Sequence, residues 1–245
     1  MRVILTHDVD SIKKPLRHIL KVRKRFSIRD IIKHVIGLKN LYNNIEDLIA
    51  LEDTYGFRST FFVPVDLFPI LEIEDILKEL VKSNWEVGLH YVVESSQNRA
   101  LMKIKKEFLQ SIVGKVLGIR IHQLLVSTKL LGIAKDLGLA YDSSYRAYEI
   151  GRFSPIVMKC GILEIPIGIM DTDLFGRLMM NERKAIKYVV SKIEEARKEG
   201  VITLLFHQES MYMKGGRIYR DVLEYIYRHE YKTLTCRDVV VNVYD

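Results

Sequence analysis

Short apolar runs alternate with longer amphipathic segments along almost the whole chain. Runs typical of buried strands lie at residues 3–6, 59–63, 86–90, 117–121, 140–142, 163–166, 203–206 and 232–234. Helical periodicity of apolar positions lies between them, at residues 45–55, 73–82, 99–111, 128–137, 182–199 and 217–228. Strands that alternate with helices form a parallel sheet, and seven or eight of them favour a closed sheet over an open one. We therefore predict an α/β fold, an irregular TIM-like (β/α)7-8 barrel.

The composition is that of one globular domain. Of the 245 residues, 48% are hydrophobic and 28% are charged, and no linker, repeat or low-complexity segment divides the chain. We expect a single barrel domain over residues 1–245. Cys160 and Cys236 each stand alone in their segments, which argues against a structural zinc ribbon or a disulfide scaffold. Since no apolar run reaches the length of a signal-peptide core or a membrane span, we expect a cytoplasmic protein.

The positive charge is concentrated in one segment. Residues 13–39, called the basic segment below, hold ten of the 38 Lys and Arg residues and one acid, Asp30, in a chain of net charge +7. Such a segment can contact nucleic acid, anionic lipid or a phosphorylated substrate, or it can be a solvated helix pair. Aromatic residues are not interleaved with the basic ones, so we do not expect nucleic-acid binding. Peripheral membrane contact, a charged substrate and a plain helix pair stay open.

Histidine and aspartate residues follow several of the predicted strands directly. They are His7, Asp8 and Asp10 after the first strand, His90 after the third, His122 after the fourth, Asp142 after the fifth, Asp171 and Asp173 after the sixth, and His207 after the seventh. In an α/β barrel the active site is assembled at the carboxyl ends of the strands. This recurrence therefore predicts a site there.

The first of these groups is His7-Asp8-Val9-Asp10. Alternation along an extended segment points Asp8 and Asp10 the same way, so that two carboxylates share a small volume. Two carboxylates that close do not both ionise readily unless a cation joins them. A divalent metal with one carboxylate as ligand and the other as base would resolve this. The alternative is a pair of helix N-caps, a position that favours aspartate.

A lone histidine at the end of a buried strand is more often a core residue than a ligand. Here His90 and His207 both end apolar runs, and His122 follows Arg120 at the end of a third. The three together make a shared catalytic or metal-binding role a better explanation than three separate core positions.

The ordered set of motifs resembles the polysaccharide deacetylase family, also called the nodulation-type chitooligosaccharide deacetylase family. The matching segments are Leu5-Thr6-His7-Asp8-Val9-Asp10, Ser59-Thr60-Phe61-Phe62-Val63, Glu86-Val87-Gly88-Leu89-His90, Gly118-Ile119-Arg120-Ile121-His122 and Leu204-Leu205-Phe206-His207. The opening is similar to the Thr-His-Asp-Val-Asp branch, which also shows segments like Tyr141-Asp142-Ser143-Ser144 and Met170-Asp171-Thr172-Asp173.

The resemblance implies a distorted barrel and the metal-dependent removal of N-acetyl groups from amino sugars. Carried onto matching positions, it implies that Asp8 is the catalytic base and Arg120 orients it. It also implies that Asp10 and His90 bind the metal and that His207 is the general acid. The implied cofactor is a divalent ion, zinc first, with cobalt, iron or nickel as alternatives.

The chain departs from the family pattern at three positions. Glu94 stands where the family has a second histidine, Tyr91 stands where it has Ser or Thr, and His122 stands where it has proline. The third metal ligand is therefore His122 or Glu94, both chemically able, and we favour His122 because it lies directly at a strand end. Loss of a tight metal site is the remaining alternative.

The substrate is less well specified. We name Asp142, Asp171 and Tyr91 as candidate substrate contacts, with a helix cap as the alternative for Asp171. An amino-sugar-containing small molecule, a lipid-linked sugar or a glycan would fit the resemblance. Two other functions stay open: a degenerate barrel that binds a glycan or a partner without turnover, and an aspartate-nucleophile phosphatase. The oligomeric state is not predicted.

Overall fold

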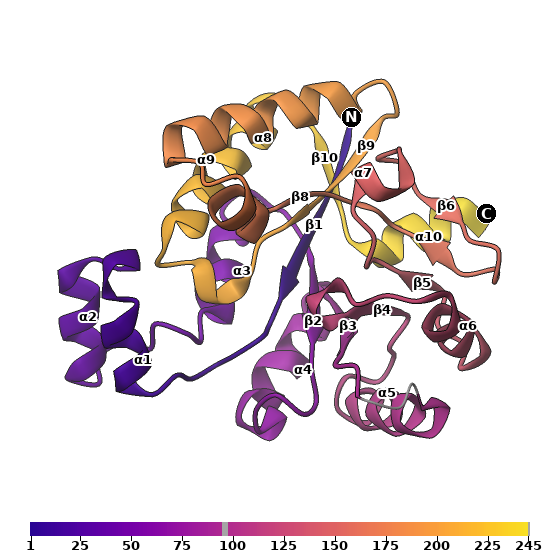
Figure 1. Cartoon of the computed structure of the whole chain (residues 1–245), viewed down its shortest axis with the longest axis horizontal. Helices are drawn as coiled ribbons and strands as arrows, with labels where there is room; N and C mark the ends of the chain where they lie inside the picture. The colour runs from indigo at the N-terminus through magenta and orange to yellow at the C-terminus, as the bar shows by residue number, and fades with distance from the viewer. Residues whose placement is uncertain (95–97, 245) are drawn as a thin grey trace.

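A curled sheet forms the centre of the molecule. The computed structural model describes residues 1–94 and 98–244, and ten strands of these ranges join one sheet (Figure 1). They are β1 (Arg2–Asp8), β2 (Thr60–Val63), β3 (Glu86–Tyr91), β4 (Gly118–Ile121), β5 (Tyr141–Asp142), β6 (Ile156–Val157), β7 (Leu163–Glu164), β8 (Ile167–Met170), β9 (Val201–Leu205) and β10 (Lys232–Leu234).

The strand order makes this sheet a barrel. It runs β6-β7-β5-β4-β3-β2-β1-β9-β8, with β10 also paired to β1, and each pair except β6–β7 is parallel. The chain passes from β7 to β8, near opposite ends of this order, through Ile165 and Pro166 alone. One short segment thus bridges the two edges, and the predicted irregular barrel is confirmed.

Helices pack around the sheet. They are α1 (Leu16–Lys21), α2 (Ile28–Val35), α3 (Ile45–Asp53), α4 (Glu74–Lys82), α5 (Arg99–Val113), α6 (Thr128–Asp136), α7 (Ala147–Ile150), α8 (Glu182–Ala196), α9 (Lys214–Arg228) and α10 (Cys236–Tyr244). Single turns of tighter or wider helix lie at Arg23–Arg25, Ile70–Ile73, His122–Leu124, Asp173–Arg177 and Gln208–Ser210. In the described part of the chain, no helix is both long and apolar enough to cross a membrane.

Local sequence explains where the longer helices lie. The α8 helix begins where the Asn181 side chain accepts a hydrogen bond from the Lys184 amide, a typical N-cap. It then buries Ala185, Val189 and Ile193, which recur at a spacing of four residues and cover the sheet. The strands are buried on both faces, as parallel strands under helices must be, and all six residues of β3 are buried.

The structure differs from the predicted pattern around residues 163–166. The predicted strand stops at Glu164, and β8 begins only at Ile167. Pro166 has no amide hydrogen to donate to a neighbouring strand, which explains the break. The short strands β6 and β8 were not predicted. β6 has only two residues, which carry no usable periodicity, and Gly168 interrupts the apolar run of β8.

The basic segment folds as a helix pair, α1 and α2, joined by the turn at Arg23–Arg25. In Figure 1 this unit lies at the left, beside α3 and away from the sheet. It is called the α1–α2 unit below.

Candidate active site

Four strands bring the predicted site residues to one end of the barrel. Their carboxyl ends surround a cavity of about 260 Å³ lined by Asp8, Asp10, His90, His122, Gln123, Leu124, Arg146, Met170, Thr172 and His207. Asp8 and Asp10 come from β1, His90 from β3, His122 from the end of β4 and His207 from the end of β9. Residues up to 199 positions apart in sequence thus share one small volume.

Three side chains in this cavity converge as metal ligands would. Asp10 Oδ1 lies 3.1 Å from His90 Nε2 and 3.3 Å from His122 Nδ1, and the two nitrogens are 3.1 Å apart. Ligands bonded at about 2.1 Å to one tetrahedral ion stand roughly 3.4 Å from one another. Asp10, His90 and His122, called the ligand triad below, therefore fit a divalent ion in both donor type and spacing.

The surroundings orient this triad. His90 Nδ1 lies 3.1 Å from the carbonyl oxygen of Arg120, which orients the ring so that Nε2 faces Asp10. Burial opposes ionisation of Asp10, but hydrogen bonds with His122 and His90 outweigh it and lower the pKa of Asp10. The hydrogen bond to Asp10 also raises the pKa of His122 against its burial. The position between these groups therefore attracts positive charge.

Asp8 is ionised by a buried arginine. Arg120 is fully buried and donates from Nη1 to Asp8 Oδ1 at 2.8 Å, while Nε and Nη2 bind the Ser143 carbonyl and hydroxyl at 2.7 Å. Burial would raise the pKa of Asp8, but Arg120, with His90 and His207, lowers it. The other oxygen, Oδ2, stays on the cavity side, 3.8 Å from His90 Nε2 and 3.9 Å from His207 Nε2.

His207 faces Asp8 with its orientation fixed by Asp171. His207 Nδ1 lies 2.6 Å from Asp171 Oδ1, and Asp171 Oδ2 accepts from the Ser210 hydroxyl at 2.6 Å. Burial alone would lower the pKa of His207, but Asp171, together with Asp8 and Asp10, raises it to about 10. At neutral pH His207 is therefore a protonated imidazolium whose Nε2 lies 3.9 Å from the Asp8 carboxylate and 3.8 Å from that of Asp10.

The turn that carries His122 is strained. Gln123 and Leu124, which follow it, both have a φ of 56°, a left-handed conformation that favours glycine. Two consecutive non-glycine residues of this kind beside a cavity are typical of functional sites, where strain is retained because the geometry is needed.

Three predicted site residues lie elsewhere. Glu94 accepts a hydrogen bond from Lys105 at 3.0 Å and lies outside the ligand triad. Tyr91 is fully buried, as is Asp142, whose carboxylate binds the Ser144 hydroxyl at 2.6 Å. Neither Tyr91 nor Asp142 lines the cavity, so the prediction that they contact substrate gains no support from this geometry. Asp171 is likewise 2% exposed and acts on His207 rather than as an open sugar contact.

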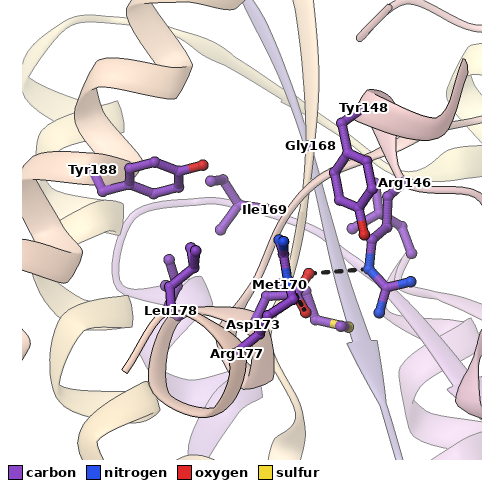
Figure 2. A pocket seen from close by; sticks show the side chains of 11 residues that line it. Arg146, Tyr148, Gly168, Ile169, Met170, Asp173, Arg177, Leu178 and Tyr188 are labelled. Atoms are coloured by element: carbon purple, nitrogen blue, oxygen red, sulfur yellow. Dashed lines mark hydrogen bonds and ion pairs between the residues drawn. The ribbon is translucent and has the colours of Figure 1, made fainter. Parts of the chain in front are cut away.

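Sequence reasoning missed Arg146, which lines the same cavity as the histidines. Its Nε donates to Asp173 Oδ2 at 3.0 Å, and Figure 2 shows this pair beside Tyr148. The adjacent hollow of Figure 2 measures about 30 Å³, room for about one water, so it is too small to hold a substrate. Asp173, which lines it, positions Arg146. Its closeness in sequence to Tyr141-Asp142-Ser143-Ser144 was the available signal.

Glu209 is a further acidic group close to the site. Burial and the nearby Asp10 raise the pKa of Glu209 to about 7. Its position two residues after His207 was noticeable in the sequence, but only the fold shows that it is turned inward.

A larger cavity of about 480 Å³ adjoins the site. Its lining includes Thr172, which it shares with the first cavity, and Asp171, which holds His207. Three cations, Lys24, Arg25 and Lys214, also line it.

Comparison with solved structures identifies the fold. A protein of Mycobacterium smegmatis assigned as a polysaccharide deacetylase superposes with a TM-score of 0.71 at 16% identity, over 99% of this chain and 89% of that one. A Bordetella bronchiseptica protein assigned as a polysaccharide deacetylase involved in O-antigen biosynthesis gives 0.56 at 18% identity, over 92% and 79%. A Bacillus anthracis pseudoenzyme of the CE4 family gives 0.57 at 10% identity, over 98% and 65%.

No protein-family model and no curated protein sequence matches the chain. The solved neighbours cover 92% to 99% of this chain, so the three-dimensional structure supports the fold that the sequence motifs predicted. The chain has the fold of the polysaccharide deacetylases.

Proposed function

We propose that this protein is a metal-dependent hydrolase that removes an acyl group, acetyl first, from the amine of an amino sugar. One observation carries the proposal: a base, Asp8, and an acid, His207, both adjoin the ligand triad. Asp8 Oδ2 is 3.8 Å from the ligand His90, and His207 Nε2 is 3.8 Å from the ligand Asp10. This is the arrangement that amide hydrolysis needs.

A divalent ion held by Asp10, His90 and His122 would polarise the acyl carbonyl and lower the pKa of an attacking water. Zinc fits the two-nitrogen, one-carboxylate set, with cobalt, iron and nickel as alternatives. Asp8, kept ionised by Arg120, accepts the water proton. His207, kept protonated by Asp171, donates its Nε2 proton to the leaving amine.

The adjoining cavity supports a substrate that carries phosphate. Lys24, Arg25 and Lys214 suit a phosphate or diphosphate, so we favour a nucleotide-linked or lipid-linked amino sugar over a neutral polymer. The Bordetella bronchiseptica neighbour is described as taking part in O-antigen biosynthesis, which agrees with a glycan precursor. A cytoplasmic location is part of the same proposal.

A non-catalytic binding barrel is the second candidate, because the Bacillus anthracis neighbour is described as a pseudoenzyme. The placement of both Asp8 and His207 favours turnover, since a binding protein needs neither a base nor an acid. The phosphatase alternative has less support: the aspartate pair faces three histidines and an arginine, and no lysine lines this cavity among the described residues.

Elemental analysis of the purified protein, prepared without chelator, tests the metal site. We expect about one divalent ion per chain in the wild type and in Glu94→Ala, which lies outside the ligand triad. Asp10→Ala, His90→Ala and His122→Ala should each lose it. A wild type that binds none of zinc, cobalt, iron or nickel would overturn the metal-dependent reading.

Acetate release from N-acetylated amino sugars and their nucleotide- and lipid-linked forms tests the reaction. Asp8→Asn and His207→Gln should retain the metal and lose at least about a hundredfold in kcat/KM. Metal binding without acetate release from any of these substrates would favour the binding barrel.

A further inference from the structure

The α1–α2 unit carries an exposed apolar surface. Seven large hydrophobic side chains that are exposed to solvent lie on it or directly after it: Leu16, Leu20, Ile28, Ile32, Val35, Ile36 and Leu38. Most large hydrophobic residues of the chain are buried, so this concentration over so short a stretch marks a binding surface rather than scattered exposure.

The surface is clearest on α2. Ile28, Ile32 and Val35 are 79%, 55% and 56% exposed and recur at spacings of four and three residues, which places them on one face. Ile31 lies at the edge of this face, is half-buried and packs against a small core that contains Ile19 and other residues. The helix is therefore held by one edge while its main apolar face looks outward, and none of its residues is buried.

The unit is anchored to the body of the protein. Ile19, Phe26, Leu41 and Tyr42 form its small core, and Tyr212 from the segment before α9 packs against it. On α1, Leu16 and Leu20 are 46% and 48% exposed whereas Ile19 is buried. The outward position of these leucines thus belongs to a packed structure.

Positive charge borders the apolar face. Arg29 and Lys33 each follow an exposed isoleucine, Ile28 and Ile32, and are exposed themselves. Asp30, the one acid of the basic segment, is neutralised by Lys39 at 2.9 Å. Although the whole chain carries +7, removing the basic segment would leave more acidic than basic residues.

We propose that the α1–α2 unit binds an anionic membrane surface, with its apolar side chains among the lipid headgroups and its cations at the lipid phosphates. An exposed apolar helix face bordered by Lys and Arg is the composition that interfacial helices share. Nucleic acid would use the cations but not the isoleucines. A second copy of this chain would bring the same positive charge to the contact.

The cavity of about 480 Å³ lies between the candidate active site and the α1–α2 unit. Lys24 and Arg25, in the turn after α1, line that cavity together with Asp171 and Thr172. A lipid-linked amino sugar could thus reach His207 while its phosphate stays near the membrane. This connection rests on the proposed function, whereas membrane binding does not.

Sedimentation with vesicles tests the proposal. The full chain is mixed at low salt with vesicles of equal parts phosphatidylcholine and phosphatidylglycerol, or of phosphatidylcholine alone. We expect binding to the anionic vesicles only, weakened at high salt. Ile28→Ser/Ile32→Ser and Arg29→Gln/Lys33→Gln should each weaken it at least about tenfold.

Matched controls lie on other helices. Ile104→Ser removes an isoleucine that is 60% exposed on α5, and Arg183→Gln/Lys184→Gln removes two exposed cations on α8. Both should bind vesicles as the wild type does. The proposal fails if the wild type does not bind anionic vesicles, or if the controls weaken binding equally.

Light scattering tests the alternative that a second copy of this chain covers the apolar face. A wild-type dimer that Ile28→Ser/Ile32→Ser converts to a monomer would assign the apolar face to a subunit contact and overturn the proposal. Because vesicle binding needs no turnover, an inactive protein that still binds anionic vesicles would contradict the proposed function alone.

Discussion

His7 and Asp8 are neighbours in the sequence, yet their side chains serve different parts of the molecule. His7 points into the core, with Nε2 2.7 Å from Glu52 Oε1 and Nδ1 2.7 Å from the Phe206 carbonyl oxygen. Asp8 points into the active-site cavity and binds Arg120. The alternation of an extended strand separates the two, so one motif supplies both a structural group and a group that faces the candidate site.

Glu52 holds His7 in the core, so its substitution should destabilise the protein. Its buried carboxylate accepts hydrogen bonds from Ser59, Trp85 and Tyr219 and pairs with His7. Glu52→Ala should lower the free energy of unfolding by about 3 kcal/mol, because it leaves several buried donors without an acceptor. Chemical denaturation measures this, with the exposed Glu79→Ala as control. A change no larger than the control's would contradict it.

The pKa of His207 depends on Asp171. Burial favours the neutral imidazole, and the Asp171 carboxylate outweighs it to give a pKa of about 10. Asp171→Asn should therefore lower the pKa of His207, so that its imidazolium is lost at a lower pH. Nitrogen NMR of the metal-free protein follows the titration directly. In an active enzyme the alkaline limb of kcat/KM should move the same way, and an unchanged titration would contradict the assigned role.

At the scale of elements, the close approach of β4 and β5 depends on a glycine. A Cβ at Gly118 would lie 1.9 Å from Cζ of Tyr141, a ring that is buried and whose hydroxyl donates to Glu86. Gly118→Ala should therefore destabilise the protein by at least about 2 kcal/mol, since the ring must move in a packed core.

The control for this prediction is another glycine. Gly132 lies within α6, and a Cβ there meets nothing within 4 Å. Gly132→Ala should raise the free energy of unfolding by about 0.5 kcal/mol, because alanine is the better helix former. Equal effects of the two substitutions in thermal or chemical unfolding would contradict the packing explanation.

Most elements were predictable from local patterns, and the failures have physical causes. The amphipathic periodicity of residues 182–199 is nearly coextensive with α8, because burial of one helix face dictates that spacing. β6 escaped prediction because its two residues carry no periodicity, and β8 because Gly168 interrupts its apolar run. At the site, Asp8, Asp10 and His90 were identified by their position after strands, whereas Arg146 required the fold.

At the scale of the whole molecule, a metal ion would link distant strands. Asp10, His90 and His122 follow or belong to β1, β3 and β4, so an ion bound by them favours the folded state over the unfolded chain. At a zinc concentration of about a hundred times the Kd, the gain is about 2.7 kcal/mol.

Zinc should accordingly raise the Tm of the wild type, and a chelator should reverse the change. Asp10→Asn should abolish the shift, and Glu94→Gln should keep it because Glu94 lies with Lys105 instead. Differential scanning calorimetry gives both values. A zinc-induced shift that persists in Asp10→Asn would place the ion at a different site.

The sequence by itself determined most of the strands, the longer helices and the appearance of His and Asp at strand ends. These features follow from burial and alternation over a few residues, which local sequence encodes. Only the tertiary structure decided that His122 rather than Glu94 joins Asp10, that Asp171 holds His207, and that β7 and β8 bridge the sheet edges. Each of these depends on how segments far apart in sequence pack together, and no local pattern carries that information.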